Sequence, residues 1–92
     1  MALSWPAKDP DEYLDYCIDW TKRLVDDDTI ASVEWFLPSA DIEKSKESHD
    51  TSKAIVWITG GLAGTIYPIL CRVTTAQGRI MDQSVNLKCA AK

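Results

Sequence analysis

The chain has 92 residues, of which 46% are hydrophobic, and its formal net charge is −4. This length fits one domain and leaves no room for a second. The acidic balance argues against nucleic acid and anionic membranes as partners, because proteins that bind phosphate groups carry a basic patch. No apolar run approaches the roughly 20 residues that cross a bilayer, and the N-terminus lacks the pattern of a signal peptide. We therefore expect synthesis and retention in the cytoplasm.

Residues 1–12 are expected to form an extended arm. They contain Pro6, Pro10 and a cluster of charges, which suit an irregular segment better than a helix or a strand. Trp5 is the exception in this polar segment. Its ring either packs on the chain's own domain, which is the commoner arrangement, or anchors a partner chain.

Residues 13–25 allow two interpretations. A helix would place an apolar stripe on one face, made of Leu14, Cys17, Ile18 and Leu24. A strand would place Tyr16, Ile18 and Trp20 on one side and more polar residues on the other. We favour the strand, because these residue types suit a pleated surface. The adjacent carboxylates of residues 26–28 repel one another and predict a solvated turn after it.

Residues 29–37 give the clearest strand of the first half, with one side formed by Ala31, Val33, Trp35 and Leu37. Pro38 ends it. The polar stretch 39–53 is expected to be a loop, with one short exposed strand over residues 41–46.

Residues 54–87 predict a meander of three antiparallel strands, on which the rest of the chain is organised. The first is apolar on both faces and so is expected to be central in a sheet. In the second, one face carries Tyr67, Ile69, Cys71 and Val73. Pro68 requires a sheet edge or a bulge at its position. The glycines of residues 60–64 and Gly78 mark the connections, where positive φ is needed.

Six or seven short strands at intervals of about ten residues are typical of an all-β, immunoglobulin-like antiparallel β-sandwich. We assign it to residues 13–90. Tyr67, at the start of the penultimate strand, resembles the tyrosine corner of such folds. Trp20, Trp35 and Trp57 lie in predicted strands and are expected to fill the core.

Three cysteines, Cys17, Cys71 and Cys89, form neither a disulfide framework nor a zinc motif. If the turn at residues 76–78 joins the last two strands, Cys89 lies ~20 Å beyond the position opposite Cys71, outside disulfide reach. A bond from Cys17 to either of the other two cysteines stays open. The single histidine, His49, lies in the polar stretch without a triad around it. We expect no catalytic residue, no metal and no cofactor, so the chain is predicted not to be an enzyme.

Three stretches in this order are similar to a family of small tailed-bacteriophage proteins: WPAKDPDEYLDYCIDWTKRL, DDDTIASVEW and WITGGLAGTIYPILCRVTTAQGRIMDQSVNLK. The resemblance covers most of the chain and is weakest over residues 38–53. It implies a fibre–tail adaptor or neck-region protein with an immunoglobulin-type sandwich and no catalytic motif. It also implies other phage virion proteins as partners, with homo-oligomers allowed in the particle, and a path from the host cytoplasm into the virion.

The function expected from this resemblance is non-enzymatic docking between virion proteins. The candidate contact residues are Trp5 and the acidic residues Asp9, Asp11 and Glu12, which would attract a basic partner; the alternative for these carboxylates is an ordinary solvated face. A second hypothesis is a β-sandwich module that binds a soluble ligand or a host protein, through loops at 39–52 and 75–78.

Overall fold

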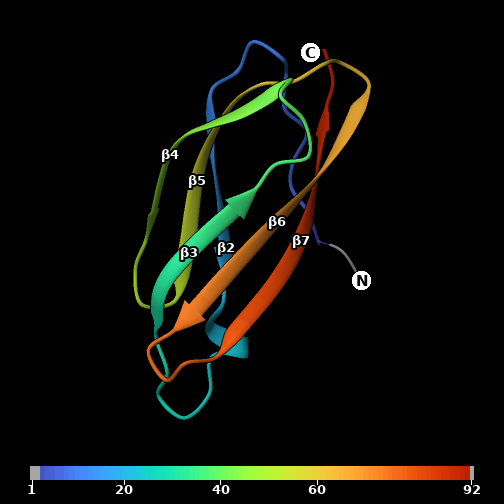
Figure 1. The fold of residues 1–92 in the computed structure, drawn as a ribbon. Helices are drawn as coiled ribbons and strands as arrows, with labels where there is room; N and C mark the ends of the chain where they lie inside the picture. The colour runs from blue at the N-terminus through green and yellow to red at the C-terminus, as the bar shows by residue number, and fades with distance from the viewer. Residues whose placement is uncertain (1–2, 92) are drawn as a thin grey trace.

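Seven β-strands form two facing sheets (Figure 1), in a computed structural model that describes residues 3–91. The four-stranded sheet has the order β1-β7-β6-β3, and the three-stranded sheet has the order β2-β5-β4. The strands are β1 (Leu3–Ser4), β2 (Leu14–Asp19), β3 (Ile30–Phe36), β4 (Ile42–His49), β5 (Lys53–Gly60), β6 (Thr65–Thr75) and β7 (Ile80–Cys89), with a 3₁₀-helix at Thr21–Arg23. The predicted all-β sandwich is confirmed, although β6 and β7, with 11 and 10 residues, are not short.

The prediction of a single three-strand meander is wrong. β6 and β7 form the expected hairpin, but β5 lies in the other sheet, between β2 and β4. The glycine-rich connection carries the chain from one sheet to the other. Gly60, Gly61 and Gly64 all have positive φ, and a Cβ at Gly60 would lie 2.7 Å from the carbonyl oxygen of Asp41. A crossing between sheets and a turn within one sheet use the same glycines, so the sequence does not distinguish them.

The core is built from side chains that alternate along the strands. β6 contributes the predicted row of Tyr67, Ile69, Cys71 and Val73, and β7 contributes Val85, Leu87 and Cys89. Trp20 and Trp35 are buried as expected. Trp57 is not in the core: it lies half-buried on the outer side of β5, with Tyr13 at 5.2 Å and the Lys46 ammonium at 5.7 Å.

The ambiguous segment 13–25 contains a strand, as favoured. In β2, Tyr16 and Ile18 point inward, and Trp20 follows them into the core, while Cys17 is exposed. The strand pairs with β5 over its whole length. Pairing with a central apolar strand stabilises this extended conformation over the alternative helix.

Two expectations about the first half need correction. β3 is irregular between Ile30 and Ser32, so Ile30 is buried and Ala31 is exposed, in place of the expected inward Ala31. Residues 42–49 form one strand, β4, rather than a short strand within a loop. Its residues are nearly all polar and exposed, because it forms the outer edge of its sheet. The strand propensity of its polar residues is low, so the sequence gives little indication of this strand. Its backbone hydrogen bonds to β5 hold it in place.

Tyr67 forms the predicted corner. Its side chain is buried, and its hydroxyl accepts a hydrogen bond of 2.8 Å from the backbone N–H of Leu62, five residues upstream. Replacing Tyr67 by Phe leaves this N–H without its acceptor, and we expect a loss of about 1–2 kcal/mol in the free energy of unfolding. Tyr13→Phe is the matched control, because its hydroxyl bonds Ser45 on the exposed surface. Equal losses in urea unfolding of the two variants would contradict this role of Tyr67.

Candidate functional site

The N-terminal arm closes one side of the sandwich. The backbone N–H of Trp5 donates to the carbonyl of Asn86 on β7 (3.0 Å), and its indole N–H donates to the carbonyl of Cys17 on β2 (3.3 Å). The indole ring stacks on Tyr16 with ring centroids 4.6 Å apart. Trp5 therefore connects β7 of the four-stranded sheet to β2, an edge strand of the three-stranded sheet. In the structure, the Trp5 ring packs on the chain's own domain, the first of its two interpretations.

Lys8 fixes the arm where it leaves β7. Its side chain is fully buried, which is rare for lysine. The ammonium donates to three carbonyl oxygens, of Asp9 (2.8 Å), Pro10 (3.4 Å) and Gly60 (2.8 Å). The backbone of Lys8 also bonds β7 and the segment after it, by Lys8 N–H to the Lys88 carbonyl and Ala90 N–H to the Lys8 carbonyl. We call these contacts of Lys8 the arm clasp.

The three predicted acidic contact residues lie in one turn directly after the arm clasp. The Glu12 carboxylate accepts from the backbone N–H of Asp9 (2.8 Å), and the Asp9 carboxylate accepts from the N–H of Asp11 (2.9 Å). Asp11 is exposed, while Asp9 and Glu12 are half-buried. We call Asp9, Asp11 and Glu12 the acidic turn. The carboxylates of Asp9 and Glu12 are held by N–H groups of the turn's own backbone.

Tyr16 lies between the two parts of the predicted site. Its ring contacts Trp5, and its pKa is raised to about 12 by burial first and then by the charge of Glu12. Trp5 itself is not part of the acidic turn, since its polar contacts run to β7 and β2. The structure thus places the three acidic residues in one turn, while Trp5 packs on Tyr16.

The remaining carboxylates near the N-terminus do not join the acidic turn. Asp15 and Asp19 are exposed on β2. Asp19 accepts from both the N–H and the hydroxyl of Thr21, and these bonds lower its pKa. Asp19 therefore shapes the start of the 3₁₀-helix.

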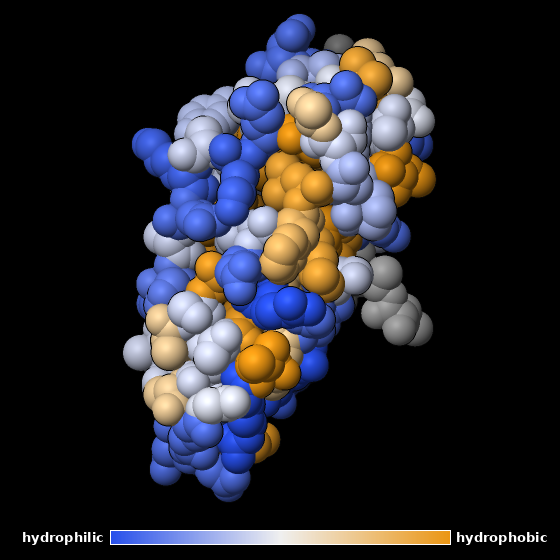
Figure 2. Space-filling model, viewed as in Figure 1, coloured by the Kyte–Doolittle hydropathy of each residue, from blue (hydrophilic) through white to orange (hydrophobic). Residues whose placement is uncertain are grey.

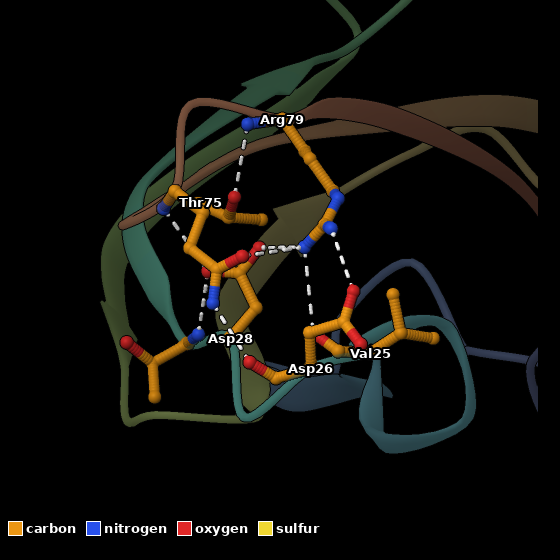
Figure 3. A network of polar contacts seen from close by, with 7 residues as sticks. Val25, Asp26, Asp28, Thr75 and Arg79 are labelled. Atoms are coloured by element: carbon orange, nitrogen blue, oxygen red, sulfur yellow. Dashed lines mark hydrogen bonds and ion pairs between the residues drawn. The ribbon is translucent and has the colours of Figure 1, made fainter.

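Asp28 is buried, which corrects the expected solvated turn of three carboxylates (Figure 3). Its carboxylate accepts from Arg79 (2.9 Å) and from the backbone N–H groups of Thr29 (2.9 Å) and Gln77 (3.1 Å). Arg79 also reaches Asp26 at 3.2 Å. Figure 3 shows these groups converging from the β2–β3 connection and the β6–β7 hairpin. The predicted hairpin loop at 75–78 is tied down at this point.

Reactive groups are dispersed over the part of the chain that the structure describes. Among residues 3–91, no three His, Cys, Asp or Glu side chains are placed to hold a metal ion. His49 ends β4, exposed. All three cysteines are free, and burial raises the pKa of the Cys71 thiol to about 12 and also raises that of Cys17. Cys71 lies opposite Gln83, as expected from the predicted hairpin, so Cys89 is six positions further along β7.

Several strand edges are protected against pairing with another chain. β4 carries charged residues and an irregularity at Ser45, both of which discourage strand addition. On the free edge of β7, the carbonyl of Asp82 accepts from Arg23 (2.8 Å) and that of Ser84 accepts from Gln83 (3.0 Å). Contacts with other proteins through added strands are therefore disfavoured at these edges.

The fold and this site define a class of protein: a small all-β sandwich whose N-terminal arm is held by the arm clasp and carries the acidic turn. Within residues 3–91, no helix is long and apolar enough to span a membrane. The comparison with protein families matches residues 8–88 to the family described as podophage GP4 fiber-tail adaptor protein gp77, and the chain belongs to this family. The resemblance to phage fibre–tail adaptors is confirmed, which supports a structural role in the virion. No curated protein matches the chain.

Neither the arm clasp nor the Asp28–Arg79 pair was predicted from the sequence. Lys8 stands in a segment without periodicity, and nothing in its neighbours indicates burial. Asp28 is one of three consecutive aspartates, and the sequence does not show which of them is buried.

Proposed function

We propose that this chain is a non-enzymatic adaptor that docks other virion proteins, and that its acidic turn contacts a basic surface of one of them. The observation that supports this most directly is the position of Asp9, Asp11 and Glu12 in one turn that is closed by its own hydrogen bonds. Like charges at one place attract a basic partner and direct its approach. Within the chain itself, the contacts of Trp5 and Lys8 hold the arm that carries this turn against both sheets.

The alternative of a loop-based ligand-binding module has less support. Residues 42–49 of its first proposed loop form β4, and its second loop is fixed by Asp28 through Gln77. Shallow hollows lie beside β4, lined by residues 44–47, and beside the 3₁₀-helix, lined by Asp19, Thr21 and Lys22. Neither contains His49 or a cysteine.

The test replaces the three carboxylates by amides, as Asp9→Asn, Asp11→Asn and Glu12→Gln, which keep the side-chain oxygens that accept hydrogen bonds. Purified protein is added to phage particles assembled without it, and the bound copies are counted at about 50 and about 300 mM salt. We expect at least a fivefold loss of incorporation at low salt, and a weaker salt dependence than that of the unmodified chain.

The control neutralises three exposed carboxylates elsewhere, as Asp27→Asn, Asp41→Asn and Glu43→Gln. It makes the same change of net charge. If both triple variants lose incorporation equally, total charge and not the acidic turn is responsible. If neither loses it, the acidic turn makes no contact.

A further inference from the structure

The outer face of the four-stranded sheet carries an apolar patch. The side chains of Ile66, Pro68 and Leu70 follow one another on this face of β6, and Phe36 on β3 lies directly opposite Leu70. Phe36 and Ile66 are 42% and 57% exposed. In Figure 2, which looks onto this sheet, hydrophobic surface gathers over the middle of β6 and near the end of β3. We call these four residues the apolar patch.

Neutral side chains border the middle of the apolar patch on the β7 side, and charged residues lie at its two ends. The neighbours of Pro68 and Leu70 on β7 are Asn86 and Ser84. In the next row, Arg72 binds both oxygens of Asp82 (2.8 and 3.1 Å) and lies opposite the exposed Glu34 of β3. The Arg72 guanidinium also lies 5.6 Å from the centre of the Phe36 ring. Lys88, opposite Ile66, marks the far end.

Strand addition is disfavoured at the free part of β6 beside the apolar patch. β3 pairs with β6 only as far as Leu70, so the edge at residues 65–69 faces no strand of its own sheet on that side. The backbone N–H of Thr75 donates to the carbonyl of Arg79 across the hairpin. Along β6, every second residue bonds β7 in this way, which gives residues 75, 73, 71, 69 and 67. The backbone nitrogen of Pro68 therefore faces away from β7, toward the unpaired side of β6. Proline has no N–H to donate there. Pro68 is thus at a sheet edge without a bulge, the first of the two alternatives predicted.

We infer that the apolar patch is a second docking surface, covered in the virion by an apolar, uncharged surface of a partner protein. This inference rests on the proposed function, because an adaptor that joins two proteins needs two separate contact surfaces. Contiguous exposed apolar groups with a polar border mark interaction sites, and the cores of interfaces are depleted in charge. The contact is made by side-chain packing, since Pro68 prevents backbone pairing.

A second copy of this chain fits the apolar patch less well. Four partly exposed side chains cover much less than the roughly 800 Å² per partner that a stable dimer buries. A small contact of this kind is effective when many copies bind one assembly, because their weak contacts add.

The experiment introduces a charge as Ile66→Glu and uses Ile80→Glu as the matched control. Ile80 is 67% exposed on the same face, beyond the Arg72–Asp82 row. In the incorporation assay with particles assembled without the protein, we expect Ile66→Glu to weaken binding at least about tenfold at both salt concentrations and Ile80→Glu to leave it within twofold. If Ile66→Glu does not fold, Ile66→Thr replaces it in the assay, because threonine keeps a β-branched side chain. We expect Ile66→Thr to weaken binding about threefold.

The outcomes separate the two proposals. Equal effects of Ile66→Glu and Ile80→Glu, or no effect of Ile66→Glu and Ile66→Thr, overturn this inference and leave the proposed function in place. A self-associated unmodified chain that Ile66→Glu converts to monomers in light scattering also overturns it, because the occupant is then a second copy. Failure of the unmodified chain to enter particles overturns the proposed function and this inference with it.

Discussion

Asp28→Asn is expected to lower the midpoint of thermal unfolding by more than about 10 °C. The Asp28 carboxylate is buried and accepts hydrogen bonds from the side chains of Thr75 and Arg79 and from two backbone N–H groups, on two connections far apart in sequence. The asparagine amide offers one acceptor oxygen in place of two, and its NH₂ group faces groups that themselves donate hydrogen bonds. Arg79 then loses its buried anionic partner, and the carboxylate that remains to it, that of Asp26, is exposed. Differential scanning calorimetry measures the change.

Asp27→Asn is the control for this experiment. Asp27 is exposed, and it has a positive φ of 60°, which asparagine also adopts. We expect its midpoint to remain within about 2 °C of that of the unmodified chain. A similar loss for both variants would show that the conformation of the turn, and not the buried ion pair, is what Asp28 supports.

The same carboxylate predicts the direction of the pH dependence. Burial alone raises the pKa of Asp28, but hydrogen bonds from Thr75, Arg79 and backbone N–H groups outweigh it and hold the pKa below its ordinary 3.8. A lowered pKa means that the ionised group stabilises the folded state fully above pH 3.8 and that this contribution is lost as the pH falls through the lower folded pKa. Asp28→Asn should therefore show a weaker loss of stability on acidification in this range than the unmodified chain.

Lys8→Met is expected to lower the free energy of unfolding by about 2–4 kcal/mol, because three carbonyl oxygens lose a charged donor in a buried place. Methionine fills the space of the lysine methylene groups, so the decrease in unfolding free energy measures the contribution of the ammonium group. In hydrogen exchange, the amides of Trp5 and Ala90, which bond across the arm and β7, should become faster while those of β6 stay protected.

Lys88→Met is the matched control, since Lys88 is exposed on β7 and contributes to the arm contacts only through its backbone carbonyl. It should change stability by less than about 0.5 kcal/mol. Unchanged exchange at Trp5 and Ala90 in Lys8→Met would mean that the backbone bonds alone hold the arm.

Residue alternation predicted the elements of this fold better than their assembly. The inward row from Tyr67 to Val73 and the strand around Ile18 follow from a period of two, which depends only on which side chains avoid water. The sheet that each strand joins depends on pairing across the molecule. β5 was therefore expected beside β6, although it pairs with β2 and β4.

The candidate site divides in the same way. Asp9, Asp11 and Glu12 are close in sequence, and a turn with Pro10 brings them together without long-range contacts. The bonds of Lys8 to Gly60 and of Asp28 to Arg79 join residues 52 and 51 positions apart. Local patterns contain no information about such pairs, which form only when both sheets are in place.

The parallel alignment of the arm with β7 has a mechanical consequence. The arm enters the sheet at Leu3, opposite Val85, and runs parallel to β7 as far as the bridge between Lys8 and Cys89, so Leu3 and Cys89 lie at opposite ends of this contact. A pulling force on the ends therefore loads the bonds at Asn86, Lys88 and Ala90 together, in shear, and does not open them one after another. A domain built in this way resists tension along its length.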